Sequence, residues 1–407
     1  MAAETIETTV AVVGGGPAGL AAACLAHAAA QEAVLVAPAS DDNDPRTVAL
    51  MQPSIRLLAA IGVWPGNLRA VCAPLRKLAL VDDTGGLFAA PNLTFDAREL
   101  FGESNDGETA FGWNVPVPAL IRALEAQVSA LGLRRIASRA ERLTYADGRA
   151  VIEAKTGERI AAKAVIAADG SGSRLRAAAG ISATEWSYRQ SAIATSFSHS
   201  MPHDGVSTEY HKPGGPFTTV PLPGNRSSLV WMERPERVQA LMALADDAFA
   251  AAIQTELHGA LGRVSEPGSR RAFPMCGLSA LTFAKARVFL VGEAAHVVPP
   301  IGAQGLNMSL RDAALAAELI GDARAFGDDP GAQKVMAEYD RRRRRDVLPR
   351  QAIVDVMNRS ILSGMAPFAL ARAAGLSALS MLPPLRRYAM QVGIGGAEQD
   401  LPRLMRA

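Results

Sequence analysis

The hydrophobic pattern predicts a strand, a helix and a second strand at the N-terminal end of the chain. An apolar run ends at Val13, a glycine-rich turn follows, and then come an alanine-rich stretch and another apolar run. A short apolar run that leads through glycines into a helical segment is typical of an α/β unit with parallel strands. The start of the chain is therefore expected to be a Rossmann-type α/β domain.

Two later regions have the pattern of β-strands. Turn signals at Asp147-Gly148 and Thr156-Gly157 divide residues 141–169 into a predicted meander. Residues 186–235 lack helical periodicity and contain β-forming runs such as "FTTVPLP" and "SSLVWM". They predict an antiparallel sheet inserted into the α/β frame, where it can form a wall for a substrate. After it, the pattern predicts a helix, the buried strand "ARVFLVG", and a mainly helical tail.

Length and composition limit the possible functions. A chain of 407 residues that is 49% hydrophobic can form two or three domains with large cores. Lys and Arg number 42 against 40 Asp and Glu, a net charge of +2, which argues against nucleic acid as a partner. The arginine run at 341–345 is expected to be a solvated helix face.

The cysteines and the apolar windows point to a cytoplasmic protein. Cys24, Cys72 and Cys276 share no metal-ligand spacing and cannot all pair, which fits a reducing compartment and no metal site. Two acids precede the first apolar run, so it does not resemble a secretory signal. No window reaches about 18 uncharged apolar residues, so a soluble or peripheral protein is expected.

The first glycine turn carries the clearest chemical signal. Gly14, Gly16 and Gly19 match G-x-G-x-x-G between a strand and a helix. The first two glycines let the backbone approach a pyrophosphate, and the third lets the helix pack close to the strand. The same motif normally includes an acidic residue about 20 residues further on, which binds a ribose. That position is Ala37, so either an acid in the following loop (Asp41, Asp42 or Asp44) reaches back or this contact is missing.

Two further stretches place special backbone at the ends of predicted strands. Asp169-Gly170 opens "DGSGSRLR" after the meander's last strand, where a loop would face a cofactor. The stretch "VGEAAHVVPPIGAQGLNMSLRD" places a carboxylate, a histidine, two prolines and two glycines between a buried strand and a helix. Paired prolines stiffen such a loop, and the amides that begin the helix can stabilise negative charge.

These three motifs make the sequence resemble the flavin-dependent aromatic hydroxylases of the para-hydroxybenzoate hydroxylase fold. The family's patterns are matched by "GGGPAG", by Asp169, Gly170, Ser173 and Arg176 of "DGSGSRLR", and by "GEAAHVVPPIGAQGLN". Within that group the chain more closely resembles the ubiquinone-biosynthesis hydroxylases, through stretches such as "DPRTVALMQPSIRLLAAIGVW" and the C-terminal "ARAAGLSALSMLPPLRRYAMQVGIG". The resemblance covers nearly the whole chain.

The resemblance implies an FAD-dependent monooxygenase that hydroxylates an aromatic ring. In the family, NAD(P)H binds transiently and reduces FAD, O2 forms a flavin 4a-hydroperoxide, and its distal oxygen attacks a phenol. The implied substrate is a prenylated phenol or quinone precursor. The implied cofactor-binding residues are Gly14, Gly16, Pro17, Ala18, Gly19, Arg46, Asp169, Gly170, Glu293, Pro300, Gly302, Gly305, Leu306 and Asn307.

The resemblance names no catalytic base, although four residues are candidates for the chemistry. Pro300 matches the family proline whose carbonyl faces the substrate ring, and His296 is either a proton relay or a structural histidine. His203 and Tyr210, like the neighbouring His211, lie in the predicted substrate sheet and could assist deprotonation of a phenol.

Three departures from the family pattern leave a second hypothesis open. Ala37 replaces the ribose acid, Glu293 replaces an aspartate, and Val117 replaces a polar residue at the start of a helix. A non-catalytic or weakly FAD-binding member, acting as a lipid-binding or scaffold subunit of a quinone-biosynthesis complex, is the alternative to an enzyme.

The expected domain division follows the motifs. An FAD-binding domain is predicted at 1–74, 107–180 and 277–326, a substrate domain at 75–106 and 181–276, and a helical C-terminal region at 327–407. The tail from Ile353 to Gly393 mixes apolar and basic residues, a composition found in helices that lie in a membrane interface. Peripheral contact with the inner face of the membrane, or with a partner complex, is a further expectation.

Overall fold

The parallel sheet predicted from the glycine motif forms the base of the molecule in a computed structural model. The structure describes residues 5–30, 32–40, 43–85, 91–103, 108–362 and 366–406. The sheet's strand order is β18 (Ala284–Lys285), β19 (Val288–Leu290), β11 (Arg159–Ala167), β1 (Thr5–Val13), β2 (Ala33–Val36) and β8 (Arg134–Ile136). From Val10 to Val13 the first strand is buried, as a central parallel strand covered on both faces requires.

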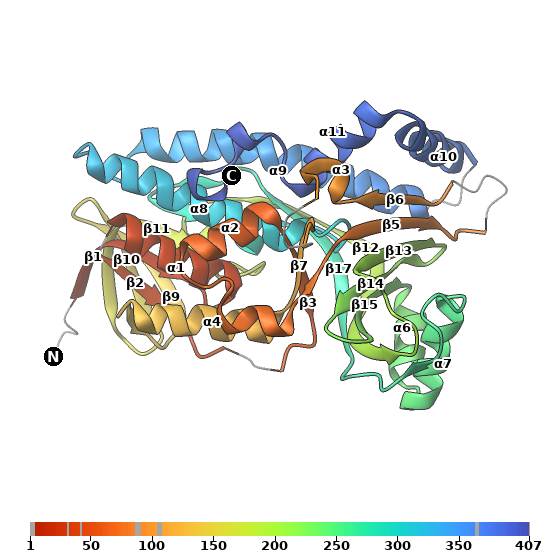
Figure 1. The fold of residues 1–407 in the computed structure, drawn as a ribbon. Coiled ribbons are helices and arrows are strands. Elements are labelled where there is room, and N and C mark those ends of the chain that lie inside the picture. Colours follow the sequence, from red (N-terminus) through yellow and green to blue (C-terminus); the bar gives the residue numbers. More distant parts are fainter. Residues whose placement is uncertain are drawn as a thin grey trace.

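One face of this sheet is covered by helices and the other side carries the meander (Figure 1). The helices are α1 (Pro17–Ala30), α4 (Val117–Ala130) and α8 (Gln304–Ala325), and α1 contacts both of the others. The meander consists of β9 (Ala140–Ala146), β10 (Arg149–Ala154) and β11. Its turns fall where predicted, because Asp147, Gly148 and Gly157 have the positive φ that such turns require.

The inserted antiparallel sheet is confirmed, and it recruits two strands from an earlier part of the chain, the first of which pairs in parallel. Its order is β20 (His296–Val297), β17 (Arg271–Ala280), β12 (Ala183–His199), β15 (Arg226–Glu233), β14 (Gly215–Leu222), β13 (Val206–Lys212), β5 (Lys77–Asp82) and β6 (Leu93–Asp96). β16 (Val264–Ser265) pairs with β12. We call this nine-stranded sheet the substrate sheet. β12 and β17 are long enough to run from the substrate sheet toward the parallel sheet, so the predicted boundary at 276/277 falls inside β17.

Smaller elements join the two sheets. A three-stranded sheet is formed by β3 (Thr47–Met51), β7 (Gly112–Pro116) and β4 (Ala73–Pro74). The outer face of the substrate sheet is covered by α6 (Pro235–Met242) and α7 (Asp246–Glu256), with an aromatic core between them. The remaining short helices are α2 (Gln52–Ala60), α3 (Arg98–Phe101) and α5 (Arg174–Ala178), with 3-10 turns at Gly66–Val71, Gly292–Ala294, Glu398–Asp400 and Arg403–Met405.

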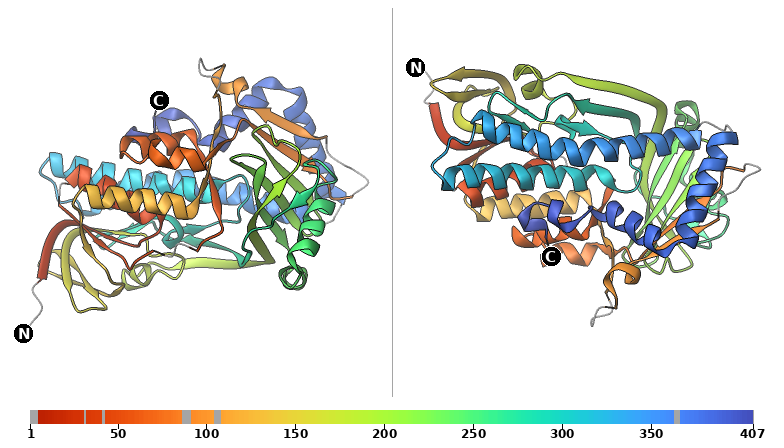
Figure 2. Two further views of the ribbon diagram at one scale, coloured as in Figure 1. Left: turned by 60° about the horizontal axis from the view of Figure 1, so that its bottom comes forward. Right: turned by 90° about the horizontal axis from the view of Figure 1, so that it is seen from above.

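The C-terminal region is helical, as expected. It contains α9 (Gln333–Leu362), α10 (Ala366–Met381) and α11 (Pro383–Ile394). Figure 2 shows α9 running beside α8 along the molecule until it reaches the substrate sheet, with α10 and α11 returning across that end. Met390 and Ile394 of α11 pack with Ala303, so the tail reaches the loop that precedes α8. Among the described residues, no helix is both long and apolar enough to cross a bilayer.

Candidate FAD site and its comparison with known proteins

Three loops predicted to bind the cofactor meet at one edge of the parallel sheet. Val13 of β1 pairs in register with Ala167 of β11, and Ala167 pairs with Leu290 of β19. All three strands run in the same direction, so the loops that follow them share the carboxyl edge of the sheet. That edge is where open α/β sheets bind their ligands.

The first loop requires glycine for two different structural reasons. A Cβ on Gly14 would lie 2.1 Å from the carbonyl oxygen of Ala168, and a Cβ on Gly19 would lie 2.1 Å from that of Gly14. These two positions are closed by protein backbone. Gly16 is exposed, and a Cβ there would meet no protein atom within 4 Å. Pro17 and Ala18 begin α1 beside it, so the open space at Gly16 lies against the helix N-terminus, which suits a pyrophosphate.

The second loop is held by its own aspartate. Asp169 Oδ1 accepts a hydrogen bond from Ser173 Oγ at 2.6 Å, and Oδ2 accepts one from the amide of Leu175. Gly170 has a φ of +85° and open space where a side chain would lie. Arg176, also from this motif, donates to the carbonyl oxygen of Ala294 at 2.9 Å and so joins the second loop to the third.

The third loop, residues 292–303, exposes the groups that the family pattern implies. Glu293, Pro300 and Gly302 of this loop are exposed, as is Gly305 in the first turn of α8, and neither glycine has protein within reach of a Cβ except the distal amide of Gln304. Ala303 adopts a left-handed φ of +55°, which costs a residue with a side chain about 1–3 kcal/mol. We call residues 292–303 the flavin loop.

The helix that follows the flavin loop begins with amides available to a ligand. α8 has no side-chain cap at Ala303, and Leu306 and Asn307 belong to its first turn. The Asn307 side chain fixes this turn against β3: its Oδ1 accepts from the amide of Met51, and its Nδ2 donates to the carbonyl oxygens of Ala49 and Ala303. These first-turn amides can stabilise an anion.

Arg46 reaches the same region from the strand β3 side. Its guanidinium is paired with Asp44 at 2.6 Å and lies 4.8 Å from the centre of the Phe273 ring. The hydrogen bonds that Arg46 donates to Asp44 raise the pKa of Arg46, and the charge of Glu293 adds to the effect. Asp44 is therefore held by Arg46, while Asp41 and Asp42 lie outside the described residues.

The missing ribose acid has a specific structural setting. Ala37 is fully buried, and its Cβ lies 3.2 Å from the position that a Cβ on Gly15 would take. Position 37 therefore faces the glycine turn, as the motif requires. Nearby, Ser40 Oγ donates to Glu125 Oε1 at 2.7 Å and lies 3.5 Å from the Gly15 carbonyl oxygen. Val117 is buried at the start of α4, and its amide donates to the Arg46 carbonyl oxygen.

Three of the four residues considered for the chemistry have structural partners. His203 Nδ1 accepts from the amide of Gly205, and its Nε2 lies 2.8 Å from the carbonyl oxygen of Leu222. Tyr210 packs with Phe217 in the core under α6 and α7, on the outer face of the substrate sheet. His296 Nε2 lies 2.7 Å from Asp312 Oδ2. Pro300 is the only one of the four on an exposed part of the flavin loop.

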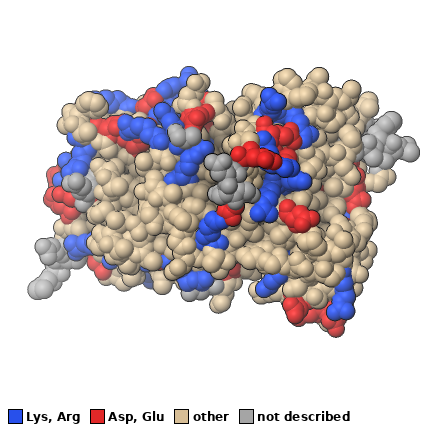
Figure 3. All heavy atoms as spheres, viewed as in Figure 1, with Lys and Arg blue, Asp and Glu red and all other residues tan. Residues whose placement is uncertain are grey.

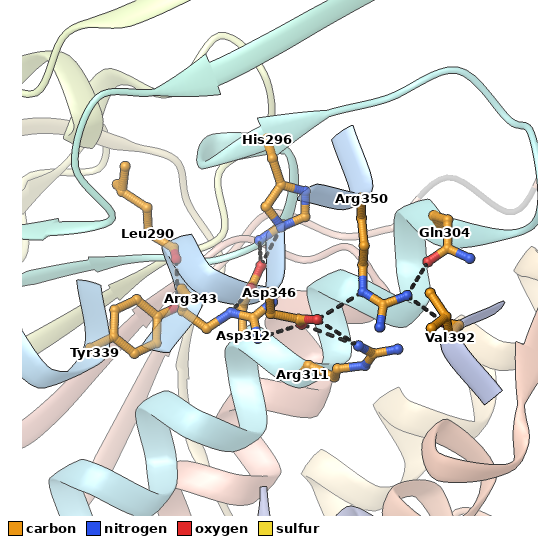
Figure 4. Close-up of polar contacts among 11 residues, drawn as sticks. Leu290, His296, Gln304, Arg311, Asp312, Tyr339, Arg343, Asp346, Arg350 and Val392 are labelled. Atoms are coloured by element: carbon orange, nitrogen blue, oxygen red, sulfur yellow. Dashed lines mark hydrogen bonds and ion pairs between the residues drawn. The ribbon is translucent and has the colours of Figure 1, made fainter. Parts of the chain in front are cut away.

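His296 belongs to a buried network that the sequence analysis missed (Figure 4). Asp312 also accepts from the amide of Gly292 and from Arg343 Nε, at 2.8 Å and 2.6 Å. Burial alone would raise the pKa of Asp312, but Arg343 and His296 outweigh it and lower that pKa. Asp346 next accepts from Arg311, Arg343 and Arg350, and these charges likewise lower its pKa.

The network ends at the flavin loop and the tail. Arg350 donates to Gln304 Oε1 and to the carbonyl oxygen of Val392, and Gln304 Nε2 donates to the carbonyl oxygens of Gly302 and Gly393. The Gln304 side chain therefore links α11 to the backbone of the flavin loop at Gly302.

The expectation that residues 341–345 form a solvated helix face was wrong for Arg343, which is 3% exposed. A signal was present: the apolar stripe of α9 through Tyr339 and Val347 passes through position 343. Neighbouring arginines of the run also have partners, since Arg341 pairs with Glu338 and Arg342 with Glu318.

The comparisons with known proteins agree with this geometry. A family model described as an FAD binding domain matches residues 7–347. The chain is 33% identical over 408 residues to a ubiquinone hydroxylase, UbiL, of Rhodospirillum rubrum, covering 98% of this chain and 92% of that protein. It is 30% identical to the 3-demethoxyubiquinol 3-hydroxylase of Escherichia coli, covering 95% and 98%. The chain belongs to the FAD-dependent aromatic hydroxylases, in the group of the ubiquinone hydroxylases.

The fold is found among solved structures of flavin enzymes. The structure of the p-nitrophenol 4-monooxygenase PnpA from Pseudomonas putida superposes with a TM-score of 0.74 at 20% identity, covering 96% of this chain and 99% of that one. The open glycines, the first-turn amides of α8 and Arg46 fit FAD, the cofactor of this hydroxylase family. Family membership also favours the enzyme over a non-catalytic scaffold.

Proposed function

We propose that this hydroxylase acts on the aromatic ring of a prenylated phenol or quinone precursor in ubiquinone biosynthesis. NAD(P)H serves as the transient reductant and O2 as the oxygen source. The names of the ubiquinone hydroxylase and of the 3-demethoxyubiquinol 3-hydroxylase support this class of substrate. An assay of the purified protein will determine which ring position is hydroxylated and whether NADH or NADPH is the reductant.

An apolar wall where the substrate sheet meets the flavin loop carries the proposal. Ala192 and Met232 of the substrate sheet form one buried cluster with Ile301 of the flavin loop and Val354 of α9. Val230, Met275, Val298 and Met357 pack around this cluster. An apolar wall beside a cofactor site suits an aromatic ring with a hydrocarbon tail, and it keeps water from the reacting centre.

The roles of the residues follow from where they lie. Bound FAD supplies the redox chemistry, which amino-acid side chains cannot provide. Gly14, Gly16 and Gly19 would hold its pyrophosphate at the start of α1, and Asp169 and Glu293 would face its ribityl side. Leu306 and Asn307 would direct amides at the negative charge of the reduced ring.

The proposal also assigns the parts of the chain. Residues 1–74, 107–180 and 277–326 would bind the cofactor, 75–106 and 181–276 would bind the substrate, and 327–407 would close the site from the tail side. The pairing of β5 with β13 supports the grouping of the second set, because it brings residues 77–82 into the substrate sheet.

We further propose that the tail is where the protein meets a membrane. Its last two helices and the residue between them expose large apolar side chains, among them Met381, Leu382, Leu385 and Tyr388, of which Tyr388 is 65% exposed. Toward α10 the surface is mostly uncharged in Figure 3, while α11 contributes Arg386 and Arg387 beside it. A prenylated phenol is nearly insoluble in water, so contact with the bilayer by this surface would place the enzyme at its substrate source.

The activity is tested with purified protein reconstituted with FAD. The protein is given 2-prenylphenol, O2 and either NADH or NADPH, and the products are identified by mass spectrometry. A hydroxylated ring is expected, with none from a Gly16→Val variant that retains the fold. A deletion strain is expected to accumulate a prenylphenol. Normal quinone levels in that strain, with no accumulated precursor, would overturn the proposed pathway.

A further inference from the structure

Two buried polar side chains lie side by side on β13. His211 Nε2 is 2.8 Å from Glu209 Oε1, and the two residues are 3% and 8% exposed. They are two positions apart, so both project from the same face of the strand. Buried histidine–carboxylate pairs are costly in an apolar setting, and they commonly serve a site.

The register of the substrate sheet decides which face this is. Glu209 pairs with Thr218 of β14, and Thr218 pairs with Val230 of β15. Cross-strand partners share a face, and Val230 packs on the cluster that contains Ile301 of the flavin loop. His211 and Glu209 therefore lie on the inner face, and Glu209 is about 10 Å from Val230 by the spacing of two strands.

Residues that alternate with these inner-face positions confirm the assignment of the two faces of the sheet. Tyr210, Phe217 and Trp231 alternate with the inner residues and lie in the core under α6 and α7. The sequence candidate Tyr210 and its neighbour His211 are thus on opposite sides of the sheet. Only His211 faces the side of the flavin loop.

On β13 and β14, two buried inner-face atoms have no hydrogen-bond partner among the described residues. They are His211 Nδ1 and Thr218 Oγ1. Asp82, the register partner of His211 in β5, accepts hydrogen bonds from Thr84. Buried polar atoms are nearly always paired in native proteins, by protein, water or ligand. Two such atoms on adjacent strands form a polar patch at the edge of an apolar wall.

The carboxylate of Glu209 determines the state of the imidazole. An ionised carboxylate can only accept a hydrogen bond, so the proton of the neutral ring lies on Nε2. Nδ1 then presents a lone pair toward the inner face. This arrangement has the logic of a general base that is oriented by an acid.

We propose that His211 Nδ1 binds the phenolic hydroxyl of the substrate and accepts its proton, with Glu209 as the positioning residue and Thr218 as a second polar contact. This proposal rests on the function proposed above. The substrate O–H bond breaks, the proton bonds to Nδ1, and the electron pair stays on the phenolate oxygen. The negative charge of the phenolate is delocalised onto the ring carbons ortho and para to that oxygen, and one of these carbons is hydroxylated. Glu209 stabilises the imidazolium, and the proton returns to the oxygen of the product.

The test compares wild type with His211→Gln and Glu209→Gln, using 2-prenylphenol as the probe. For His211→Gln we expect kcat to fall by about a hundredfold or more, the usual range for a lost general base. NAD(P)H oxidation should continue and yield hydrogen peroxide instead of product. FAD affinity and melting temperature should stay at wild-type values. Glu209→Gln should lower kcat less, because Nδ1 remains.

Matched controls separate this role from a structural one. Thr208→Val changes the same strand on its other face and should leave kcat and the product yield per NAD(P)H unchanged. Thr218→Val should raise KM more than it lowers kcat. If His211→Gln does not fold, Glu209→Gln becomes the deciding variant.

The outcomes distinguish this inference from the function on which it rests. A wild-type enzyme that binds FAD but forms no product overturns the proposed function, and this inference with it. A wild-type enzyme that hydroxylates the probe, with His211→Gln or the deciding variant equal to it in kcat and yield, overturns the inference alone.

Discussion

His296 Nε2 lies 2.7 Å from Asp312 Oδ2, and both side chains are almost completely buried. The other oxygen of Asp312 accepts from Arg343 at 2.6 Å, so one carboxylate joins the flavin loop, α8 and α9. His296 is thereby fixed as a link in a buried network. Its position favours a structural role over that of a proton relay.

We expect Asp312→Asn to lower the free energy of unfolding by about 3–5 kcal/mol. The change leaves the buried guanidinium of Arg343 without one of its counter-charges, and breaking a buried pair costs about this much. Asp322→Asn is the control on the same helix, since its partner Arg403 is exposed. It should cost about 1 kcal/mol or less. Urea unfolding measures both, and equal losses would contradict a stabilising network.

The pH dependence of stability follows from the lowered pKa values of Asp312 and Asp346. A carboxyl group whose pKa is lower in the folded state stabilises the protein fully above its unfolded pKa of about 4. That contribution is lost as the pH falls toward the lowered folded pKa. Melting temperatures should therefore drop steeply below about pH 4. The drop in melting temperature should be smaller in Asp346→Asn. If melting temperature depends on pH in the same way in the variant and in wild type, the buried carboxylates are not the cause.

Substitutions at the two kinds of glycine in the first motif should have different effects on folding and on flavin binding. Gly16→Val should fold normally and lose the flavin absorbance, because its side chain enters space that only the cofactor would use. Gly19→Val should fail to fold, because its Cβ would lie 2.1 Å from a backbone oxygen. Circular dichroism and the flavin spectrum test this together. A Gly16→Val protein with a normal flavin spectrum would refute the assigned pyrophosphate site.

Ala37→Glu should tighten FAD binding roughly tenfold or more. A hydrogen bond from the ribose to a charged acceptor contributes about 1.5–3 kcal/mol, and position 37 faces the glycine turn. The measurement is the Kd from flavin fluorescence, with Glu293→Asp measured alongside. Unchanged binding in Ala37→Glu would mean that another group, such as Glu125 beside Ser40, already serves the ribose.

Removing the apolar side chains of α11 should weaken binding to anionic liposomes. Truncating the tail is a poor test, because Val392 and Gly393 accept hydrogen bonds beside the flavin loop. The triple change Leu382→Ser, Leu385→Ser and Tyr388→Ser alters only exposed positions. Phe326→Ser, at an 84% exposed residue at the end of α8, is the control. Co-sedimentation that is equal for both variants and wild type would exclude α11 as the contact.

The sequence by itself determined the elements whose signals are local. The turn after Val13 requires glycine at positions 14 and 19, because a backbone oxygen lies where a Cβ would be, while Gly16 leaves open space beside the start of α1. The meander and the inserted sheet were also predictable, since alternation and turn residues act over a few positions. The flavin loop could be located from the family resemblance because its motif is also a short, continuous stretch of sequence.

Only the tertiary structure decided which faces meet. Alternation along β13 separates Tyr210 from His211, but the packing of α6 and α7 on one side and the flavin loop on the other determines which of them faces the site. Arg343 has the charge of a solvated residue and is buried because Asp312 and Asp346, distant in sequence or a turn away, compensate that charge. Contacts between distant segments leave no local pattern, so these relationships had to be read from the fold.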